Sequence, residues 1–153
     1  VVMIKIICVG KIKESFYREA VQEYLKRLSK YTRIEIQEVA DDGSLEPQTQ
    51  VHRESERVMK QIQAKDYVIL MDIDGRELSS SDFARELDQT FLTNSNITFV
   101  IGGSYGLDDT VRSRANARIS FSKMTFPHQL FRVILLEQIY RAYKIINHET
   151  YHK

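Results

Sequence analysis

Residues 96–107 read N-I-T-F-V-I-G-G-S-Y-G-L. The first six residues are mostly β-branched or aromatic, which is typical of a strand whose two faces are both buried. A glycine-rich turn follows directly, and residues 109–115 then have the composition of a short helix. A buried strand that passes through a tight turn into a helix is the building unit of an α/β fold with a parallel sheet.

The same alternation of strand and helix patterns continues through the whole chain. Strands are predicted at residues 4–9, 33–39, 67–71, 96–101 and 117–121. Helices are predicted at residues 15–28, 51–62, 109–115 and 127–146, and another begins near Ser79. The sequence therefore predicts a single α/β domain over residues 1–153, with a mainly parallel sheet and helices on both faces. Ligands of such sheets bind at the carboxyl ends of the strands.

Composition places the chain among ordinary globular proteins. Charged residues make up 28% of the 153 residues and hydrophobic residues 42%. The uncharged apolar stretches are far too short to cross a membrane. Cys8, the single cysteine, lies in an apolar predicted strand, so we expect a buried thiol in a reducing compartment. We therefore expect a cytoplasmic protein with no membrane partner.

The net charge of +1 conceals an uneven distribution along the chain. Residues 1–109 carry 14 basic and 19 acidic side chains, whereas residues 110–153 carry 8 basic and 2 acidic ones. A locally basic C-terminal quarter is compatible with binding of a polyanion such as RNA. A solvated surface with uneven charge explains the same pattern.

The last residues contain the H-E-x-x-H pattern of zinc hydrolases, formed by His148, Glu149 and His152. In that class of enzyme the pattern lies on a central helix and a third ligand follows downstream, but here only Lys153 follows. The last predicted helix also ends near Asn147, before the pattern begins. We therefore expect no metal site.

Residues 102–106 match the G-x-S-x-G pattern of serine hydrolases, with Ser104 as the candidate nucleophile. Asp108 or Asp109, and then His128, complete the required order of acid and base. Both aspartates, however, follow the serine too closely to orient the histidine from behind. A small serine hydrolase remains an alternative, and a tight turn from strand to helix also explains the glycines.

Residues 120–129 read S-F-S-K-M-T-F-P-H-Q and alternate small hydroxyl side chains with large apolar ones. This loop is too apolar to be freely solvated. Its backbone groups, with Phe121, Met124 and Phe126, are suited to enclosing a flat heteroaromatic ring. A buried connection between two elements is the simpler explanation of the same residues.

The helix predicted after this loop is apolar on more than one side, since twelve of the nineteen residues 128–146 are apolar. We expect one side to pack on the sheet and another to pack on a second copy of the chain. The sequence therefore predicts a homodimer.

Three stretches resemble the RlmH family of SPOUT-class methyltransferases: I-G-G-S-Y-G-L at residues 101–107, residues 120–145, and Y-H-K at residues 151–153. The resemblance runs the full length of the chain, from I-K-I-I-C-V-G-K-I-K-E at residues 4–14. It implies a SPOUT-type fold with a C-terminal trefoil knot, a homodimer, and S-adenosyl-L-methionine as cofactor. It also implies methylation of N3 of a pseudouridine in 23S ribosomal RNA, on the assembled 70S ribosome.

The resemblance further implies a cofactor pocket formed by the end of one strand, the glycine turn and the apolar loop. Its residues are Leu70, Met71, Gly102, Gly103, Phe121, Ser122, Lys123, Met124, Thr125 and Phe126. Because the two glycines lack side chains, we expect them to let the cofactor approach the backbone closely.

Methylation of an imide nitrogen requires loss of its proton and stabilisation of the charge that develops. His152 is the candidate general base, and Tyr151 is expected to stack on or hydrogen-bond the target base. Arg141 is the candidate that stabilises the anion, held by Glu137 one helical turn earlier. A routine surface ion pair explains the same spacing of Glu137 and Arg141.

His128 and Arg132 lie at the start of the last predicted helix. We expect them to contact the cofactor or an RNA phosphate, and with Tyr151 and His152 to form the substrate-binding set; His128 also fits a helix cap. A catalytically inactive RNA-binding module remains a further alternative, which differs from the enzyme only in turnover.

Overall fold

A sheet of five parallel strands organises the computed structural model, which describes residues 2–43 and 46–151. The strands are β1 (Met3–Val9), β2 (Arg33–Val39), β3 (Tyr67–Glu77), β4 (Asn96–Ile101) and β5 (Ala117–Ser120). They lie in the order β2-β1-β4-β3-β5, and each neighbouring pair is parallel. The parallel α/β sheet predicted from the sequence is confirmed.

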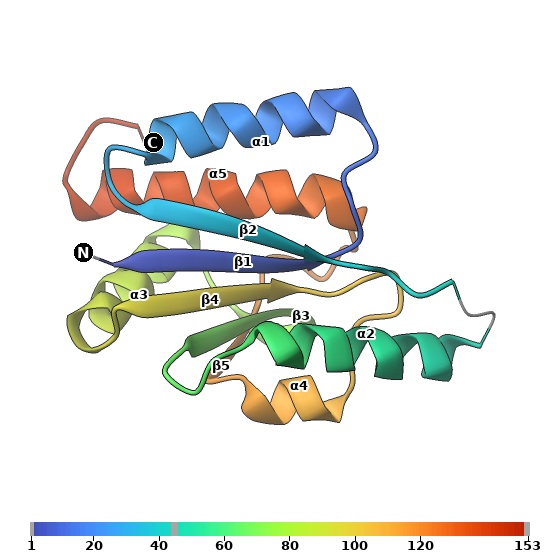
Figure 1. The fold of residues 1–153 in the computed structure, drawn as a ribbon. Coiled ribbons are helices and arrows are strands. Elements are labelled where there is room, and N and C mark those ends of the chain that lie inside the picture. The colour runs from blue at the N-terminus through green and yellow to red at the C-terminus, as the bar shows by residue number, and fades with distance from the viewer. Residues whose placement is uncertain (1, 44–45, 152–153) are drawn as a thin grey trace.

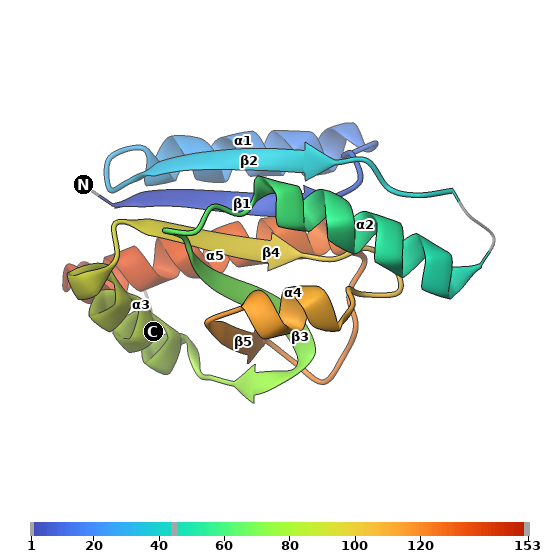
Figure 2. The same ribbon diagram turned by 60° about the horizontal axis from the view of Figure 1, so that its bottom comes forward.

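Helices cover both faces of the sheet, as Figures 1 and 2 show. One face carries α1 (Ser15–Leu28), α3 (Ser80–Thr93) and α5 (His128–Ile146), and the other carries α2 (Pro47–Gln61) and α4 (Asp109–Arg114). None of the helices in the described part of the chain is long and apolar enough to cross a membrane.

The central strands are buried on both faces, which explains their nearly continuous apolar sequences. Along β1, Ile4, Ile6 and Cys8 belong to the core under α1, α3 and α5, whereas Ile7 and Val9 belong to the core under α2 and α4. Successive side chains of a strand point to opposite faces, so a strand covered on both sides needs apolar residues at every position.

Helix α2 begins at Pro47, four residues before the predicted start. Proline occupies the first turn, where its missing N–H is not needed. The three residues that follow are polar, and the apolar periodicity begins only at Val51. The prediction therefore placed the start of this helix too late.

Strand β3 continues to Glu77, six residues beyond its predicted end. Its pairing with β5 shifts between Met71 and Arg76, so residues 72–75 leave the regular ladder. Gly75 lies directly against β5, since a Cβ atom on it would be 2.7 Å from the backbone nitrogen of Ile119. The apolar pattern ends at Met71, and the sequence alone therefore gave no sign of the extension.

Helix α5 contacts both α1 and α3 within the same chain. Its fully buried side chains, among them Leu135, Leu136 and Ile139, share one core with residues of those helices and of the sheet. The apolar excess of α5 is therefore largely accounted for inside one chain and does not by itself require a second copy. The homodimer stays a prediction that needs other support.

Replacing Gly75 with alanine is expected to lower the free energy of unfolding by about 1–3 kcal/mol, because a new Cβ atom forces the backbone of β5 to move. Urea denaturation measures this change. Gly43→Ala is the matched control, since a Cβ atom there meets nothing within 4 Å. Its effect is expected to stay below about 0.5 kcal/mol. Equal free energies of unfolding of the two variants would show that β5 can move without a loss of stability.

The Cys8 thiol is expected to be inert in the native protein, because burial raises its pKa from 9.0 to about 12. Only the thiolate reacts with DTNB, so at about pH 8 the native protein should react far more slowly than the urea-unfolded protein. Since the folded pKa lies above the unfolded value, the protonated thiol contributes stability that is lost as pH rises from 9.0 toward about 12. Equal reaction rates of native and unfolded protein would contradict the burial.

Candidate cofactor site

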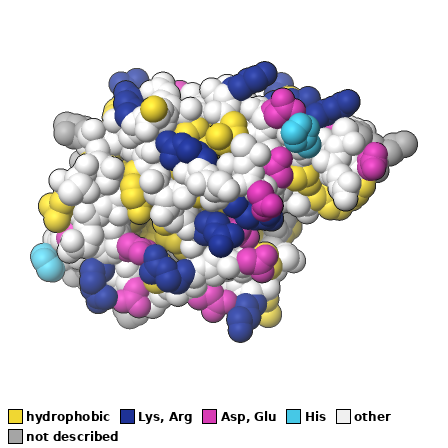
Figure 3. All heavy atoms as spheres, turned by 90° about the horizontal axis from the view of Figure 1, so that it is seen from below, with side chains coloured by type: hydrophobic (Ala, Val, Ile, Leu, Met, Phe, Trp, Pro, Cys, Tyr) yellow, Lys and Arg dark blue, Asp and Glu magenta, His cyan; other side chains and the backbone are white. Residues whose placement is uncertain are grey.

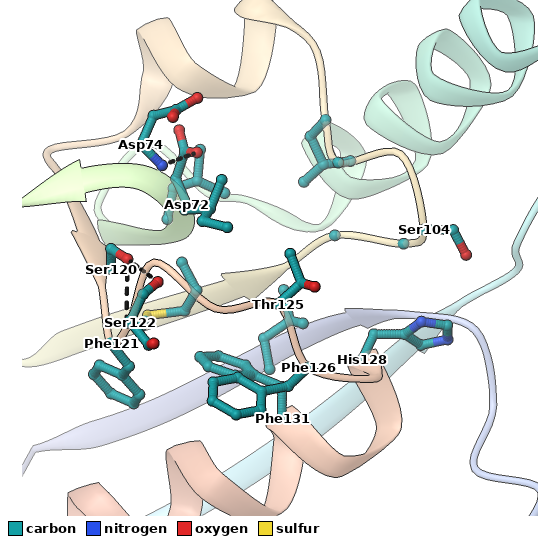
Figure 4. A pocket seen from close by; sticks show the side chains of 18 of the residues that line it. Asp72, Asp74, Ser104, Ser120, Phe121, Ser122, Thr125, Phe126, His128 and Phe131 are labelled. Atoms are coloured by element: carbon teal, nitrogen blue, oxygen red, sulfur yellow. Dashed lines mark hydrogen bonds between the residues drawn. The ribbon is translucent and has the colours of Figure 1, made fainter.

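A cavity of about 820 Å³ opens at the carboxyl ends of β3, β4 and β5 (Figure 4). Residues 70–74 line it from β3, residues 101–107 from the turn after β4, and most of residues 119–128 from β5 and the loop that follows. Its volume is in the range of small-molecule sites. Its position is the one at which parallel sheets bind ligands.

Nine of the ten residues predicted to bind the cofactor line this cavity. They are Leu70, Met71, Gly102, Gly103, Phe121, Ser122, Met124, Thr125 and Phe126. The tenth, Lys123, is exposed and lies outside the lining. The structure thus brings the three predicted segments together, and their binding of the cofactor stays a prediction.

The turn after β4 needs its glycines for its own packing. The amide of Gly106 donates to the carbonyl of Gly103 at 3.1 Å, and Gly106 has a φ of 75°, which favours glycine. A Cβ atom on Gly102 would lie 3.1 Å from Leu107 Cγ, and one on Gly103 would lie 2.9 Å from Glu54 Oε1. The missing side chains make room for the tight turn, which was the alternative explanation of these glycines, and for α2, whose contact the sequence did not reveal.

Hydrogen bonds inside the loop after β5 fix its course, two of them drawn in Figure 4. The hydroxyl of Ser120 donates to the carbonyl of Ser122 at 2.8 Å, and the amide of Ser122 donates back to Ser120 Oγ at 3.3 Å. Ser122 Oγ accepts from the amide of Met124 at 2.9 Å. The hydroxyls of Ser120 and Ser122 thus each close a local turn, which explains why small hydroxyl residues recur in this loop.

Phe121 of this loop packs on the protein core, and Phe126 contacts Phe131 while remaining partly exposed. Phe121 lies edge-on to Phe83 with ring centroids 5.3 Å apart, and 5.4 Å from Phe131. Phe126 stacks on Phe131 at 6.4 Å, whereas the side chain of Met124 is 74% exposed. Both rings therefore help to hold the loop, and all three apolar side chains line the cavity. Their enclosure of a flat ring stays a prediction.

One side of the cavity is acidic, which the sequence analysis missed. Asp72 and Asp74 lie together there (Figure 4), and the amide of Asp74 donates to Asp72 Oδ1 at 3.1 Å. Asp72 Oδ2 lies 3.4 Å from Arg118 Nη1 and 3.7 Å from Arg112 Nε, so cations accompany this carboxylate. A signal was present, because polar residues directly after a buried parallel strand lie at the ligand-binding edge.

Ser104 is exposed on the turn after β4, and His128 lines the same side of the cavity (Figure 4). The two candidate aspartates have other partners. Asp108 caps the start of α4, and Asp109 accepts from Arg112 at 2.8 Å. Within the described residues neither aspartate is bonded to His128, so the G-x-S-x-G match lacks the third member of a triad.

The predicted catalytic residues gather elsewhere, around the carboxylate of Glu137 on α5. Glu137 Oε1 accepts from Arg141 Nε at 2.8 Å, which confirms the expected pair. Glu137 Oε2 accepts from the hydroxyls of Tyr151 at 2.8 Å and Tyr24 at 3.1 Å. The guanidinium carbon of Arg141 lies 4.8 Å from the centroid of the Tyr151 ring. Glu137 therefore holds the C-terminal tail, while His152 lies outside the described residues.

Both tyrosines at Glu137 are held in their neutral forms. Burial, and then the Glu137 carboxylate, raise the pKa of Tyr24 to about 12. Burial and then the hydrogen bond to Glu137 raise the pKa of Tyr151 as well. In this arrangement Tyr151 is a hydrogen-bond donor and not a base.

The length of α5 separates this cluster from the cavity of the same chain. Arg141 lies thirteen residues after His128, which is about 20 Å along a helix. Arg132 lies outside the cavity lining, and its side chain is 1% exposed. It donates to Glu38 at 2.6 Å and to the carbonyl of Gly10 at 3.2 Å. Arg132 therefore braces the start of α5, and burial leaves it no surface for an RNA phosphate.

His148 and Glu149, the described metal-pattern residues of H-E-x-x-H, lie beyond the end of α5, and His152 lies outside the described residues. Asn147 caps the end of α5, as predicted, and His148 has a φ of 56°. Glu149 accepts hydrogen bonds from Tyr31 at 2.7 Å and from Lys144 at 3.2 Å. Among residues 2–43 and 46–151, no group of three or more His, Cys, Asp or Glu side chains is placed to hold a metal ion.

The basic side chains of the C-terminal quarter are largely engaged within the chain. Those with carboxylate or backbone partners are Arg112, Arg114, Arg118, Arg132, Arg141 and Lys144. On the face that Figure 3 shows, Lys and Arg lie interspersed with Asp and Glu. The positive excess seen in the sequence is therefore spread over ion pairs and does not form a continuous basic surface on that face.

Comparison with known proteins gives a consistent result. A family model described as "Predicted SPOUT methyltransferase" matches residues 2–152. Ribosomal RNA large subunit methyltransferase H of Caldicellulosiruptor saccharolyticus is 49% identical, over 99% of this chain and all of the relative. The proteins of that name from Ruminiclostridium cellulolyticum and Clostridium botulinum (strain Hall) are 51% and 50% identical, each over 98% of this chain and 99% of the relative. The chain therefore belongs to the RlmH family of SPOUT methyltransferases, as its sequence motifs indicated.

Proposed function

We propose that this protein transfers a methyl group from S-adenosyl-L-methionine to large-subunit ribosomal RNA, at N3 of a pseudouridine. The observation that carries the proposal is the cavity of about 820 Å³, which three segments far apart in the sequence line at the carboxyl ends of parallel strands. Relatives 49–51% identical are named for methylation of this RNA. We further propose the assembled 70S ribosome as the substrate and the cytoplasm as the location.

The residues of the cavity suit an adenosyl compound. The loop of residues 120–127 is held by its own serine hydroxyls, so its backbone amides and carbonyls are fixed in place and would be available to hydrogen-bond a purine. Ile119 and Phe131 provide apolar lining for a flat ring. Asp74, and Asp72 with its charge partly balanced by Arg112 and Arg118, give the lining carboxylates that would attract a sulfonium or ammonium group. When bound, S-adenosyl-L-methionine supplies an electrophilic methyl group.

The acceptor sets a second requirement. N3 of pseudouridine carries a proton between two carbonyl groups, and this proton must leave as the new N–C bond forms. We assign removal of the proton to His152 and contact with the target base to Tyr151. Arg141, held by Glu137 at 2.8 Å, stabilises the negative charge that develops. A cation that is fixed in advance does this without reorganisation during the reaction.

We infer that a second subunit brings these groups to the cavity. Within one chain, Arg141 lies about 20 Å from His128 along α5. In a twofold-symmetric dimer, the tail of each subunit can lie at the cavity of the other, and the contact occurs twice. The protein is then a homodimer with two composite sites. The trefoil knot that the family implies for the C-terminal segment stays a prediction.

Calorimetric titration with S-adenosyl-L-methionine tests the cofactor site. Wild-type protein is expected to show saturable binding, and Thr125→Trp is expected to show none, because the indole fills the cavity that Thr125 lines. Leu92→Trp is the control, since Leu92 is exposed on α3 and lies outside the lining. Folded wild-type protein that does not bind the compound would contradict the proposal.

Transfer of a labelled methyl group to ribosomes tests the reaction itself. Ribosomes from a strain without the modification are expected to accept label from the wild-type protein but not from Thr125→Trp, and nuclease digestion with mass spectrometry identifies the labelled nucleoside. Cofactor binding without any transfer would favour the inactive RNA-binding module instead. Label on a nucleoside other than pseudouridine would correct the proposed acceptor.

Mixed dimers test whether the sites are composite. One chain carries Thr125→Trp and lacks the cavity, and the other carries Tyr151→Ala with His152→Ala and lacks the tail. Each variant alone is expected to be inactive. Co-expressed with different affinity tags and purified through both, the mixed dimer should have about half of wild-type activity, since one of its two sites is complete. An inactive mixed dimer would show that each tail serves its own subunit.

A further inference from the structure

Exposed apolar side chains gather around the mouth of the cavity. Six large hydrophobic side chains are exposed among the described residues, and four of them line the cavity. Those four are Ile73, Tyr105, Met124 and Phe126, whereas Phe16 and Leu92 lie elsewhere. Apolar surface concentrated at the rim of a site is typical of surface that another molecule covers.

Tyr105 is prominent in this rim because a closed turn presents it. It lies between Gly103 and Gly106, which form an isolated bridge and a hydrogen bond of 3.1 Å. Its side chain is 59% exposed although the backbone on either side is fixed. An aromatic ring held in this way contacts a partner with little loss of conformational freedom.

Helix α2 supports the turn from behind. Ser55 Oγ accepts from the amide of Asp108 at 2.9 Å, two residues after the turn. Glu54 is 1% exposed, contacts the position of a Gly103 Cβ atom, and accepts from the amide of Asp42 at 2.9 Å. These buried contacts set the position of Tyr105 before any partner arrives.

Two arginines near the mouth are engaged with carboxylates, whereas Lys123, in the loop after β5, is exposed. Arg112 lies 2.8 Å from Asp109 and 3.7 Å from Asp72, and Arg118 lies 3.4 Å from Asp72. Attraction of phosphates by these groups is weakened accordingly. Stacking of unpaired bases on aromatic rings also gives affinity for RNA, without ion pairs to phosphates. Stacking works with any base, because every base has a flat aromatic face.

We propose that Tyr105 is a substrate-positioning residue whose ring stacks on the nucleobase next to the target nucleotide, at the mouth of the cavity. The inference rests on the proposed function, because an RNA substrate is what brings an unstacked base to this place. A target base that is extruded into the cavity leaves its neighbour without a stacking partner. The ring of Tyr105 replaces that partner, and Ile73, Met124 and Phe126 surround the extruded nucleotide.

Steady-state methylation of ribosomes, with separate calorimetry of the cofactor, tests this role. Tyr105→Ala is expected to raise the KM for ribosomes about tenfold, the order of magnitude that one base–aromatic stack contributes. Its Kd for S-adenosyl-L-methionine is expected to stay at the wild-type value. Tyr105→Phe keeps the ring and should keep the wild-type KM. Leu92→Ala, which removes an exposed apolar side chain outside the cavity, is the matched control.

The outcomes separate this inference from the function on which it rests. A wild-type protein that binds the cofactor but methylates no ribosome overturns both. An active wild-type protein with an unchanged KM in Tyr105→Ala overturns this inference alone. A weaker Kd for the cofactor would place Tyr105 in the cofactor pocket, and loss of the dimer in sedimentation would place it at the subunit interface; either result also overturns the inference.

Discussion

Burial of both faces of the central strands is the constraint on which the rest of the structure depends. Strands β1, β3 and β4 contribute apolar side chains to both cores, so groups that bind a polar ligand have room only where the strands end. Because all five strands are parallel, the carboxyl ends of β3, β4 and β5 and the turns that leave them meet at one edge. The position of the cavity at that edge follows from the sheet, and the individual residues determine only its shape and chemistry.

The same constraint explains which features can be predicted from the sequence. Apolar strands and helical periodicity are local signals, and they located the strands and the helices. The three segments of the cavity lining were implied by the resemblance to the RlmH family instead. The departure of residues 72–75 from the regular ladder was not predicted, because it depends on pairing between β3 and β5, which are distant in the sequence. Roles of single residues were hardest to infer. Arg132 resembled a surface cation, and only packing shows that it is buried against Glu38.

The two loops of the cavity acquire their shapes in different ways. The turn after β4 is held from outside, by Glu54 and Ser55 on α2, whereas the loop after β5 is held from within by Ser120 and Ser122. Residues whose sequence pattern suggested contacts with a ligand therefore also fix the course of the backbone. A cavity whose walls are fixed before binding loses less conformational entropy when a ligand enters.

The hydrogen bonds of Glu137 decide how the proposed chemistry is divided between chains. Its two oxygens accept from Arg141, Tyr24 and Tyr151, so the tail is tied to α5 and α1. A tail that crossed about 20 Å to its own cavity would break the hydrogen bond from Tyr151 to the charged Glu137 carboxylate, worth about 1.5–3 kcal/mol. A second subunit can present the same cluster intact, without that cost. The geometry of a single chain therefore favours a site shared between two subunits over a tail that swings across its own.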